Sequence, residues 1–157
     1  MAQVELCEVS AETVHQVAAL SVLDEHKHLV ATNAGSLTEA LFAPEARYRA
    51  IFADGARQGL VMLYDETLRA TPPAEPRIVV WRLMVDAGLR GQGIGRSALP
   101  QVIEHVRAKR VFTALGLSYV PGPRNPEPFY LGLGFRPTGR VDAGEVVLAL
   151  PLGAGDT

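Results

Sequence analysis

The spacing of hydrophobic and polar residues divides the chain into an N-terminal part that is mostly helical and a later part rich in strands. Ser10 stands before the first apolar-periodic stretch, as a helix N-cap should. Ser36 and Glu39 have the spacing of a capping box and predict a further short helix. The N-terminal part therefore predicts a strand followed by helical segments, over 4–9, 11–23, 24–31 and 37–42.

From residue 47 onward the pattern changes to that of β-strands. The runs "YRAIFAD" (48–54) and "GLVMLYDE" (59–66) are separated by "GARQ", which is typical of a β-hairpin. The next run, "RIVVWRLMVD" (77–86), is apolar with Arg82 as its interior charge. Such a run predicts a central strand that is covered on both faces.

Residues 93–109 have the apolar period of an amphipathic helix. Pro100 lies inside this segment and removes the N–H that would bond to the Arg96 carbonyl, at a cost of about 3 kcal/mol in a regular helix. We therefore expect a kink or a locally broken hydrogen-bond ladder near 96–100. One face of the helix is apolar and comprises Ile94, Ala98, Leu99, Val102, Ile103 and Val106.

The C-terminal part predicts strands around one short helix. Asn125 is a suitable N-cap, Pro126 suits the first helical position, and Gly134 suits the C-cap. The predicted elements are a strand over 111–120, a helix over 126–133, and strands in "FRPTG" (135–139) and "EVVLALPL" (145–152). Together the elements predict an α+β fold in which a mostly antiparallel sheet carries helices on both faces.

Composition and charge narrow the class of protein. The chain has 157 residues, 48% of them hydrophobic, which suits one domain over 1–157 with a substantial core. A net charge of −2 gives no basic footprint for nucleic acid or an anionic membrane. Cys7 is the single cysteine, so no intramolecular disulfide forms. With no signal-like start and no apolar run long enough to span a bilayer, we expect a cytoplasmic protein without membrane contact.

Glycines crowd the junction between the predicted central strand and the amphipathic helix. Gly91, Gly93 and Gly95 remove side chains at a helix N-terminus, where unpaired N–H groups favour an anion. Neither the P-loop pattern nor the dinucleotide G-x-G-x-x-G spacing fits this turn. The pattern alone leaves two interpretations open, a phosphate-binding turn or simply a tight turn.

Two motifs at the proper separation resemble those of the GCN5-related N-acetyltransferase (GNAT) superfamily. "RGQGIG" (90–95) is similar to the family's acetyl-coenzyme A signature, and it follows a predicted strand and opens a helix. Asn125 and "FYLGLGF" (129–135) resemble the family's second conserved segment. Further stretches are similar to the bacterial spermine/spermidine acetyltransferase branch, namely 30–40, 80–86, 134–139 and 144–150.

The resemblance implies a site for acetyl-CoA as co-substrate. The end of the central strand would offer backbone groups to the pantetheine arm, the glycine turn would hold the pyrophosphate, and Asn125 would contact the cofactor arm. Tyr130 would protonate the leaving thiolate, as a tyrosine hydroxyl can; the alternative for Tyr130 is an aromatic residue of the core. The implied cofactor-binding residues are Leu83, Met84, Val85, Arg90, Gly91, Gln92, Gly93, Ile94, Gly95, Arg96 and Asn125.

The implied reaction is direct attack of an amine on the acetyl carbonyl, with a polyamine such as spermidine as the first acceptor to consider. A protonated amine must lose a proton before attack, yet the central strand reads Trp81-Arg82 where many relatives carry a glutamate. Glu25, Glu145 or a carboxylate acting through water remain open as the base. Trp81 and Tyr64 are candidates to line the acceptor pocket, with core packing as the alternative.

Other functions remain open at this point. The missing strand carboxylate leaves a non-catalytic acyl-CoA-binding module as one alternative, and other amines, including amino acids, aminoglycosides and peptide N-termini, as another. Dimers are common in the superfamily, so a homodimer is an oligomeric state to test. His15, His26 and His28 have no accompanying carboxylate cluster, so no metal site is expected.

Overall fold

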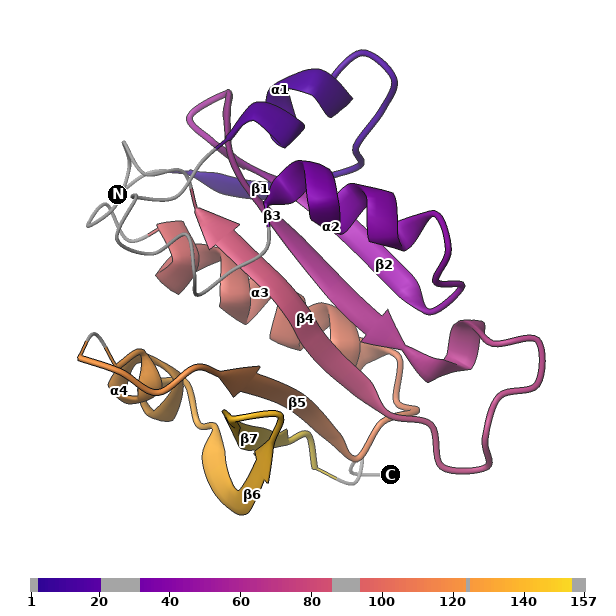
Figure 1. The fold of residues 1–157 in the computed structure, drawn as a ribbon, viewed down its shortest axis with the longest axis vertical. Coiled ribbons are helices and arrows are strands. Elements are labelled where there is room, and N and C mark those ends of the chain that lie inside the picture. Colours follow the sequence, from indigo (N-terminus) through magenta and orange to yellow (C-terminus); the bar gives the residue numbers. More distant parts are fainter. Residues whose placement is uncertain (1–2, 21–31, 86–93, 124, 154–157) are drawn as a thin grey trace.

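The computed structural model of the chain describes residues 3–20, 32–85, 94–123 and 125–153. Its strands form one seven-stranded sheet in the order β1-β2-β3-β4-β5-β7-β6 (Figure 1). All neighbouring strands are antiparallel except β4 and β5, which are parallel. The elements are β1 Val4–Cys7, α1 Val14–Ala19, α2 Asn33–Ala40, β2 Ala46–Ala53, β3 Ala56–Asp65, η2 Glu66–Leu68, β4 Ile78–Val85, α3 Ile94–Ala108, β5 Ala114–Tyr119, α4 Glu127–Gly132, β6 Arg136–Asp142 and β7 Glu145–Pro151.

Helices cover both faces of the sheet, as the α+β prediction required (Figure 1). Side chains of a strand alternate between the faces, so Ala50 and Leu60 face one way while Ile51 and Val61 face the other. Ala50 and Leu60 pack with Val17 of α1, and Ile51 and Val61 belong to the main core with α3. We call these the α1/α2 face and the α3 face.

The predicted β-hairpin forms between β2 and β3, with a turn shorter than "GARQ". Asp54 and Gly55 connect the strands with φ of 51° and 78°. Two successive positive φ values match a type I′ turn, whose twist suits a tight hairpin. The strands could therefore extend inward to Ala53 and Ala56, which are paired.

The helix starts near the N-terminus differ from the predictions. α1 is capped at Thr13 and not at Ser10, whose carbonyl accepts from the Thr13 and Val14 amides. The capping box of Ser36 and Glu39 is also wrong, because Thr32 caps α2 one turn earlier and accepts from the Gly35 amide at 3.0 Å. Ser36 thereby lies buried inside the helix. The predicted helical segment 24–31 lies outside the described residues.

α3 is the long helix of the α3 face, and its buried side follows the predicted apolar stripe. Ala98, Leu99, Val102, Ile103 and Val106 are all buried. The helix continues through Pro100 from Ile94 to Ala108 as one element. The predicted kink stays a prediction. Gln101, next in the chain, donates its side-chain amide to the Val4 carbonyl at 2.8 Å and so ties α3 to the edge strand β1.

α4 spans Glu127–Gly132, one residue shorter at each end than predicted, and its N-cap is Pro126 where the sequence predicted Asn125. The Asn125 side chain still accepts from the Glu127 amide at 2.9 Å. At the other end Gly134 has φ of 102°, and its amide donates to the Leu131 carbonyl. The Phe135 amide donates to the Tyr130 carbonyl at 3.2 Å, which completes a Schellman motif.

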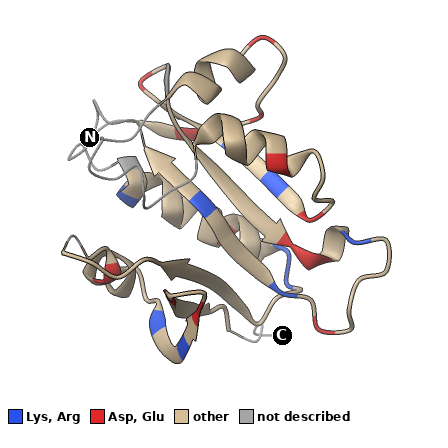
Figure 2. Ribbon diagram, in the orientation of Figure 1, with Lys and Arg blue, Asp and Glu red and all other residues tan. Residues whose placement is uncertain are grey.

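Acidic and basic residues form a network where β3 leads through η2 toward β4 (Figure 2). Glu66 is buried and accepts from the Arg77 backbone at 2.8 Å and from its guanidinium at 2.8 and 3.2 Å. Arg69 pairs with Glu45 and with Glu66 at 3.0 and 3.3 Å. These bonds fix the start of β4, where the strand is paired with both β3 and β5.

Within the described ranges, no helix is both long enough and apolar enough to cross a membrane.

Candidate active site

The central strand β4 separates from β5 partway along its length. The two parallel strands pair only from Ile78–Leu115 to Val80–Leu117, although β4 continues to Val85 and β5 to Tyr119 (Figure 1). Beyond Val80, backbone groups on the β5 side of β4 have no strand partner among the described residues. Such groups need another hydrogen-bond partner, which a bound molecule can supply.

A bulge marks the point of separation. Met62 of β3 faces Arg82 and Leu63 faces Val80, so Trp81 is the extra residue of β4. A bulge bends its strand and increases the local twist, which turns the end of β4 away from β5. The sequence signal for it was only the pair of large residues, Trp81 and Arg82, within an apolar run.

The predicted pantetheine-binding residues Leu83, Met84 and Val85 form the separated end of β4. A Cβ atom on Gly59 of β3 would lie 2.2 Å from the Met84 carbonyl oxygen, so that carbonyl faces β3. Backbone groups of successive residues in a strand point to alternate neighbours. We therefore infer that Leu83 and Val85 direct their amides and carbonyls toward the β5 side.

The first turn of α3 lies beside this end of β4. A Cβ atom on Gly95 would meet Val85 at 3.9 Å and Phe129 of α4 at 4.0 Å. The helix N-terminus, the end of β4 and α4 therefore converge at one place. Arg96 follows in the same turn and is exposed. The backbone of Ile94 begins α3, whereas the predicted residues Arg90, Gly91, Gln92 and Gly93 lie outside the described residues.

Tyr130 projects from α4 into an aromatic group beside the separated strands. Its ring lies 5.3 Å from Phe129, 6.5 Å from Tyr119 and 6.0 Å from Phe135, measured between ring centroids. Burial raises the pKa of the Tyr130 hydroxyl above its ordinary value of 10.0, because the phenolate would be poorly solvated. No described residue hydrogen-bonds to this hydroxyl. It therefore stays protonated near neutral pH and is able to donate, and both interpretations of Tyr130 remain compatible with its packing.

Tyr119 and Glu127 form a pair that the sequence did not predict. Tyr119 is buried at the end of β5, and its hydroxyl donates to the Glu127 carboxylate in the first turn of α4. That bond raises the pKa of Tyr119 to about 12. The pair holds α4 against β5 and so fixes where Tyr130 lies. The two residues are eight positions apart across a Pro-rich loop, so no local pattern linked them.

The structure brings Trp81 and Tyr64 together on the α1/α2 face. Their rings are edge-to-face with centroids 5.8 Å apart. The Arg82 guanidinium lies 5.2 Å from the centroid of the Trp81 ring and 3.5 Å from the Glu39 carboxylate of α2. A cation of the protein itself therefore already covers the Trp81 ring.

Of the two glutamates considered as the base, the structure describes Glu145 and not Glu25. Glu145 lies at the start of β7, where its carboxylate accepts from the Ser118 hydroxyl at 3.0 Å. Ser118 is the first residue of β5 beyond the last pair with β4, so this carboxylate lies near the separated strands. Glu25 lies outside the described residues, and so do His26 and His28.

The described residues contain no group of three or more metal-ligating side chains. His15 is exposed on α1.

Comparison with known proteins gives the family. The sequence profile of the acetyltransferase (GNAT) family matches residues 14–135. The comparison with curated proteins gave no match.

Solved structures share the fold at low sequence identity. An aminoglycoside acetyltransferase, AAC(6')-Ib, in complex with coenzyme A superimposes with a TM-score of 0.74 at 14% identity, covering 95% of each chain. The PaiA N-acetyltransferase from Thermoplasma acidophilum, also in complex with coenzyme A, gives 0.64 at 16% identity and covers 95% of this chain and 99% of its own. A GNAT family acetyltransferase from Elizabethkingia anophelis with acetyl-CoA bound gives 0.64 at 15% identity, covering 96% and 97%.

Proposed function

This chain belongs to the acetyltransferase (GNAT) family, and we propose that it transfers acetyl from acetyl-CoA to a small amine. The observation that carries the proposal is the separation of β4 from β5 beyond Val80, next to the N-terminus of α3. That arrangement offers a free strand edge for an amide-bearing arm and a helix N-terminus for a pyrophosphate. We also propose that residues 1–157 form one catalytic domain.

The residues present fit acetyl-CoA at this place. Leu83 and Val85 offer donors and acceptors that resemble those of a neighbouring strand, which suits the amides of the pantetheine arm. Gly95 has no side chain to hold a phosphate away from the first amides of α3. Two of the solved structures with the same fold contain coenzyme A and a third contains acetyl-CoA.

The reaction joins the amine nitrogen to the acetyl carbonyl carbon and breaks the bond from that carbon to sulfur. The leaving thiolate takes a proton, and we assign its donor as the hydroxyl of the half-buried Tyr130. The attacking amine must itself lose a proton, and Glu145, held by Ser118, is the described carboxylate that we assign to this step through water. Glu25 remains a second candidate.

The acceptor that we propose to test first is a polyamine, because several segments resemble the spermine/spermidine branch. Glu39 on the α1/α2 face is a carboxylate that suits a cationic acceptor. Arg82 opposes this assignment, because its guanidinium occupies the Trp81 ring and pairs with Glu39. A polyamine must therefore displace Arg82 from one of these contacts. We further propose that the protein is cytoplasmic and that it forms a homodimer. Analytical ultracentrifugation would test the homodimer.

The experiment is an assay of thiol release from acetyl-CoA with separate panels of polyamines, amino acids, aminoglycosides and peptides. We expect turnover with polyamines and release of one thiol for each acetylated amine. Turnover confined to another panel would reject the polyamine and retain the transferase. Tight coenzyme A binding with no release from any panel would support the acyl-CoA-binding module instead.

A further inference from the structure

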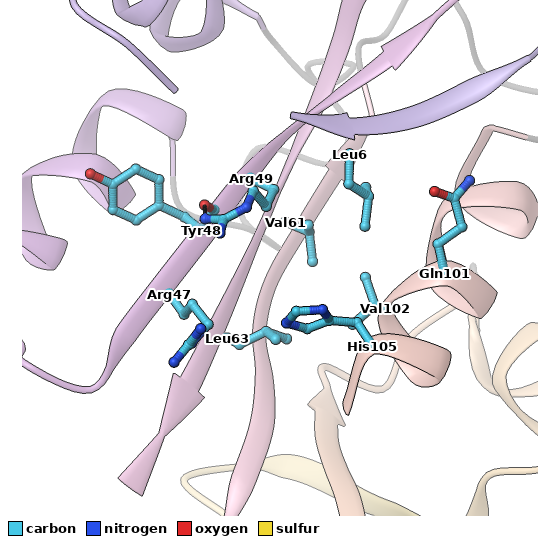
Figure 3. Close-up of a pocket in the computed structure, with 9 residues that line it drawn as sticks. All are labelled: Leu6, Arg47, Tyr48, Arg49, Val61, Leu63, Gln101, Val102 and His105. Carbon is cyan, nitrogen blue, oxygen red and sulfur yellow. Dashed lines mark hydrogen bonds between the residues drawn. The ribbon is translucent and has the colours of Figure 1, made fainter. Parts of the chain in front are cut away.

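A cavity of about 260 Å³ lies on the α3 face, among β1, β2, β3 and α3. Its apolar floor comes from β1, β3 and α3 and consists of Leu6, Val61, Leu63 and Val102 (Figure 3). The volume has room for several water molecules. It is slightly below the usual range for small-molecule sites, and such sites also combine an apolar lining with a few polar groups.

The cationic or titratable groups of this α3-face cavity come from two arginines and a histidine, and Tyr48 and Gln101 also line it. Arg47 and Arg49 are alternate residues of β2 and so share a face, and Gln101 and His105 are one turn apart on α3. In Figure 3 the His105 ring extends from the helix toward the strands. None of the described residues that line the cavity carries a carboxylate.

Two carboxylates beyond the lining reduce this positive charge without removing it. Asp65 is fully buried and pairs with the Arg47 Nε at 3.3 Å. No described residue accepts from the terminal amino groups of Arg47, so these donors remain available. Arg49 donates to the Tyr48 carbonyl at 2.7 Å, and its other amino group is 3.9 Å from Glu8, which is exposed.

The pKa of His105 reflects the positive charge around the cavity. Its pKa lies below the ordinary value of 6.5, first because burial disfavours the cation and then because Lys109, Arg47 and Arg49 repel it. Asp65 acts in the opposite direction and is the weakest of these influences. A cationic ligand would meet the same repulsion, whereas an anion would be attracted and would favour protonation of His105.

From the cavity's shape, apolar floor and cationic rim, we propose that it is a binding site for a small organic carboxylate with an apolar body. The apolar body lies on Val61, Leu63 and Val102, and the carboxylate accepts from Arg49 and His105. The acetyl-transfer reaction uses none of these residues. His105 is ten residues beyond Gly95 in α3, which places it about 15 Å farther along the helix axis.

Calorimetry with 2-naphthoate tests the proposal, with uncharged 2-naphthamide as the matched ligand. At pH 5.5 we expect naphthoate to bind at least about tenfold more tightly than naphthamide, the ratio expected from one charge-assisted hydrogen bond. At pH 8 the naphthoate affinity falls, because neutral His105 no longer contributes a charge. Saturating coenzyme A should leave both affinities unchanged, since none of the residues that line this cavity is assigned to the cofactor.

Variants locate the site. Arg49→Gln is expected to weaken naphthoate about tenfold and to leave naphthamide unchanged. His105→Gln removes the pH dependence. Arg107→Gln is the matched control, because Arg107 is an exposed cation of the same helix that does not line the cavity and pairs with Glu104. Thermal unfolding confirms that each variant is folded.

Three results would overturn the proposal. The first is equal affinity for naphthoate and naphthamide, or no saturable binding of either. The second is an equal loss of affinity in Arg49→Gln and Arg107→Gln. The third is displacement of naphthoate by coenzyme A.

Discussion

The two sides of β4 differ in how they are paired. On one side β3 pairs with β4 along its whole length, from Gly59–Val85 to Asp65–Ile78. On the other side β5 pairs only at Ile78, Val79 and Val80. The same strand is therefore both a fixed part of the scaffold and a free edge.

Glycines on the two neighbouring strands differ in how closely they approach β4. A Cβ atom on Gly59 of β3 would lie 2.2 Å from the Met84 carbonyl oxygen. A Cβ atom on Gly116 of β5 would lie 3.4 Å from Val79, which is an ordinary contact. Close packing on the β3 side keeps β4 in place while the β5 side opens. The fold can thus offer unpaired backbone groups to a ligand without losing the order of the strand.

The largest expected effect is a loss of turnover, from a substitution on the β5 side of β4. Tyr130→Phe removes the proposed proton donor, so we expect turnover to fall about 1,000-fold, within the range for a positioned proton donor. Coenzyme A affinity should stay close to that of the natural protein, and steady-state kinetics with calorimetry separates the two.

Tyr119→Phe is the comparison for Tyr130→Phe, and because it only loosens the hold on α4 we expect a much smaller loss of turnover. It removes a hydroxyl from the same aromatic group, one that already donates to Glu127. Equal losses of turnover in the two variants would mean that the aromatic packing matters and not proton donation by Tyr130.

On the β3 side of β4, we expect a substitution to change the free energy of unfolding. Gly59→Ala forces β3 away from the Met84 carbonyl, and we expect a loss of about 3 kcal/mol, typical of overpacking. Gly116→Ala should cost less than about 1 kcal/mol, because its new contacts are ordinary. Urea unfolding of both variants measures the difference, and equal losses would contradict the contrast between the two sides.

The paired end of β4 should be sensitive to acid. Bonds from Arg77 lower the pKa of Glu66 below its ordinary value of 4.5, so ionised Glu66 stabilises the fold above that pH. This stability is lost as the pH falls through the lowered pKa. Glu66→Gln should cost about 2 kcal/mol at pH 7, the scale of hydrogen bonds to a charged group.

The Glu66→Gln variant should also lose less stability than the natural protein between pH 5 and pH 3, in urea unfolding at each pH. Glu75→Gln, an exposed residue of the same connection, is the control. A parallel pH dependence in Glu66→Gln and the natural protein would show that Glu66 does not carry the effect.

The smallest expected effect concerns the start of α4. Asn125→Ala removes the cap to the Glu127 amide and should cost about 1 kcal/mol. Asn125→Asp keeps the capping oxygen and removes the amide donors. If Asn125 also contacts the cofactor arm, the Asp variant keeps its stability and loses coenzyme A affinity; retention of both properties would exclude that contact.

Local signals predicted much of the fold. Asn125, Pro126 and Gly134 gave the limits of α4 to within one residue, because helix ends depend on neighbouring residues. The apolar stripe of α3 gave its buried side for the same reason. Thr32 was missed because two good caps stand close together, and the earlier one begins the helix.

The place where β4 separates from β5 could not be predicted from local patterns. Where the β4–β5 ladder stops depends on the register of strands far apart in the chain and on the bulge at Trp81. The bond from Tyr119 to Glu127 likewise spans a Pro-rich loop. The sequence could place Tyr130 and the cofactor residues only through resemblance, since their geometry comes from these distant contacts.

Amide hydrogen exchange, followed residue by residue by NMR with and without coenzyme A, tests the central claim most directly. The Leu83 and Val85 amides should exchange about 100-fold more slowly at 100 times the dissociation constant, because bound coenzyme A takes the place of a strand on the β5 side. The Leu60 and Met62 amides of β3 should change little. Saturated binding with unchanged exchange at Leu83 and Val85 would contradict the claim that the open side of β4 holds the cofactor.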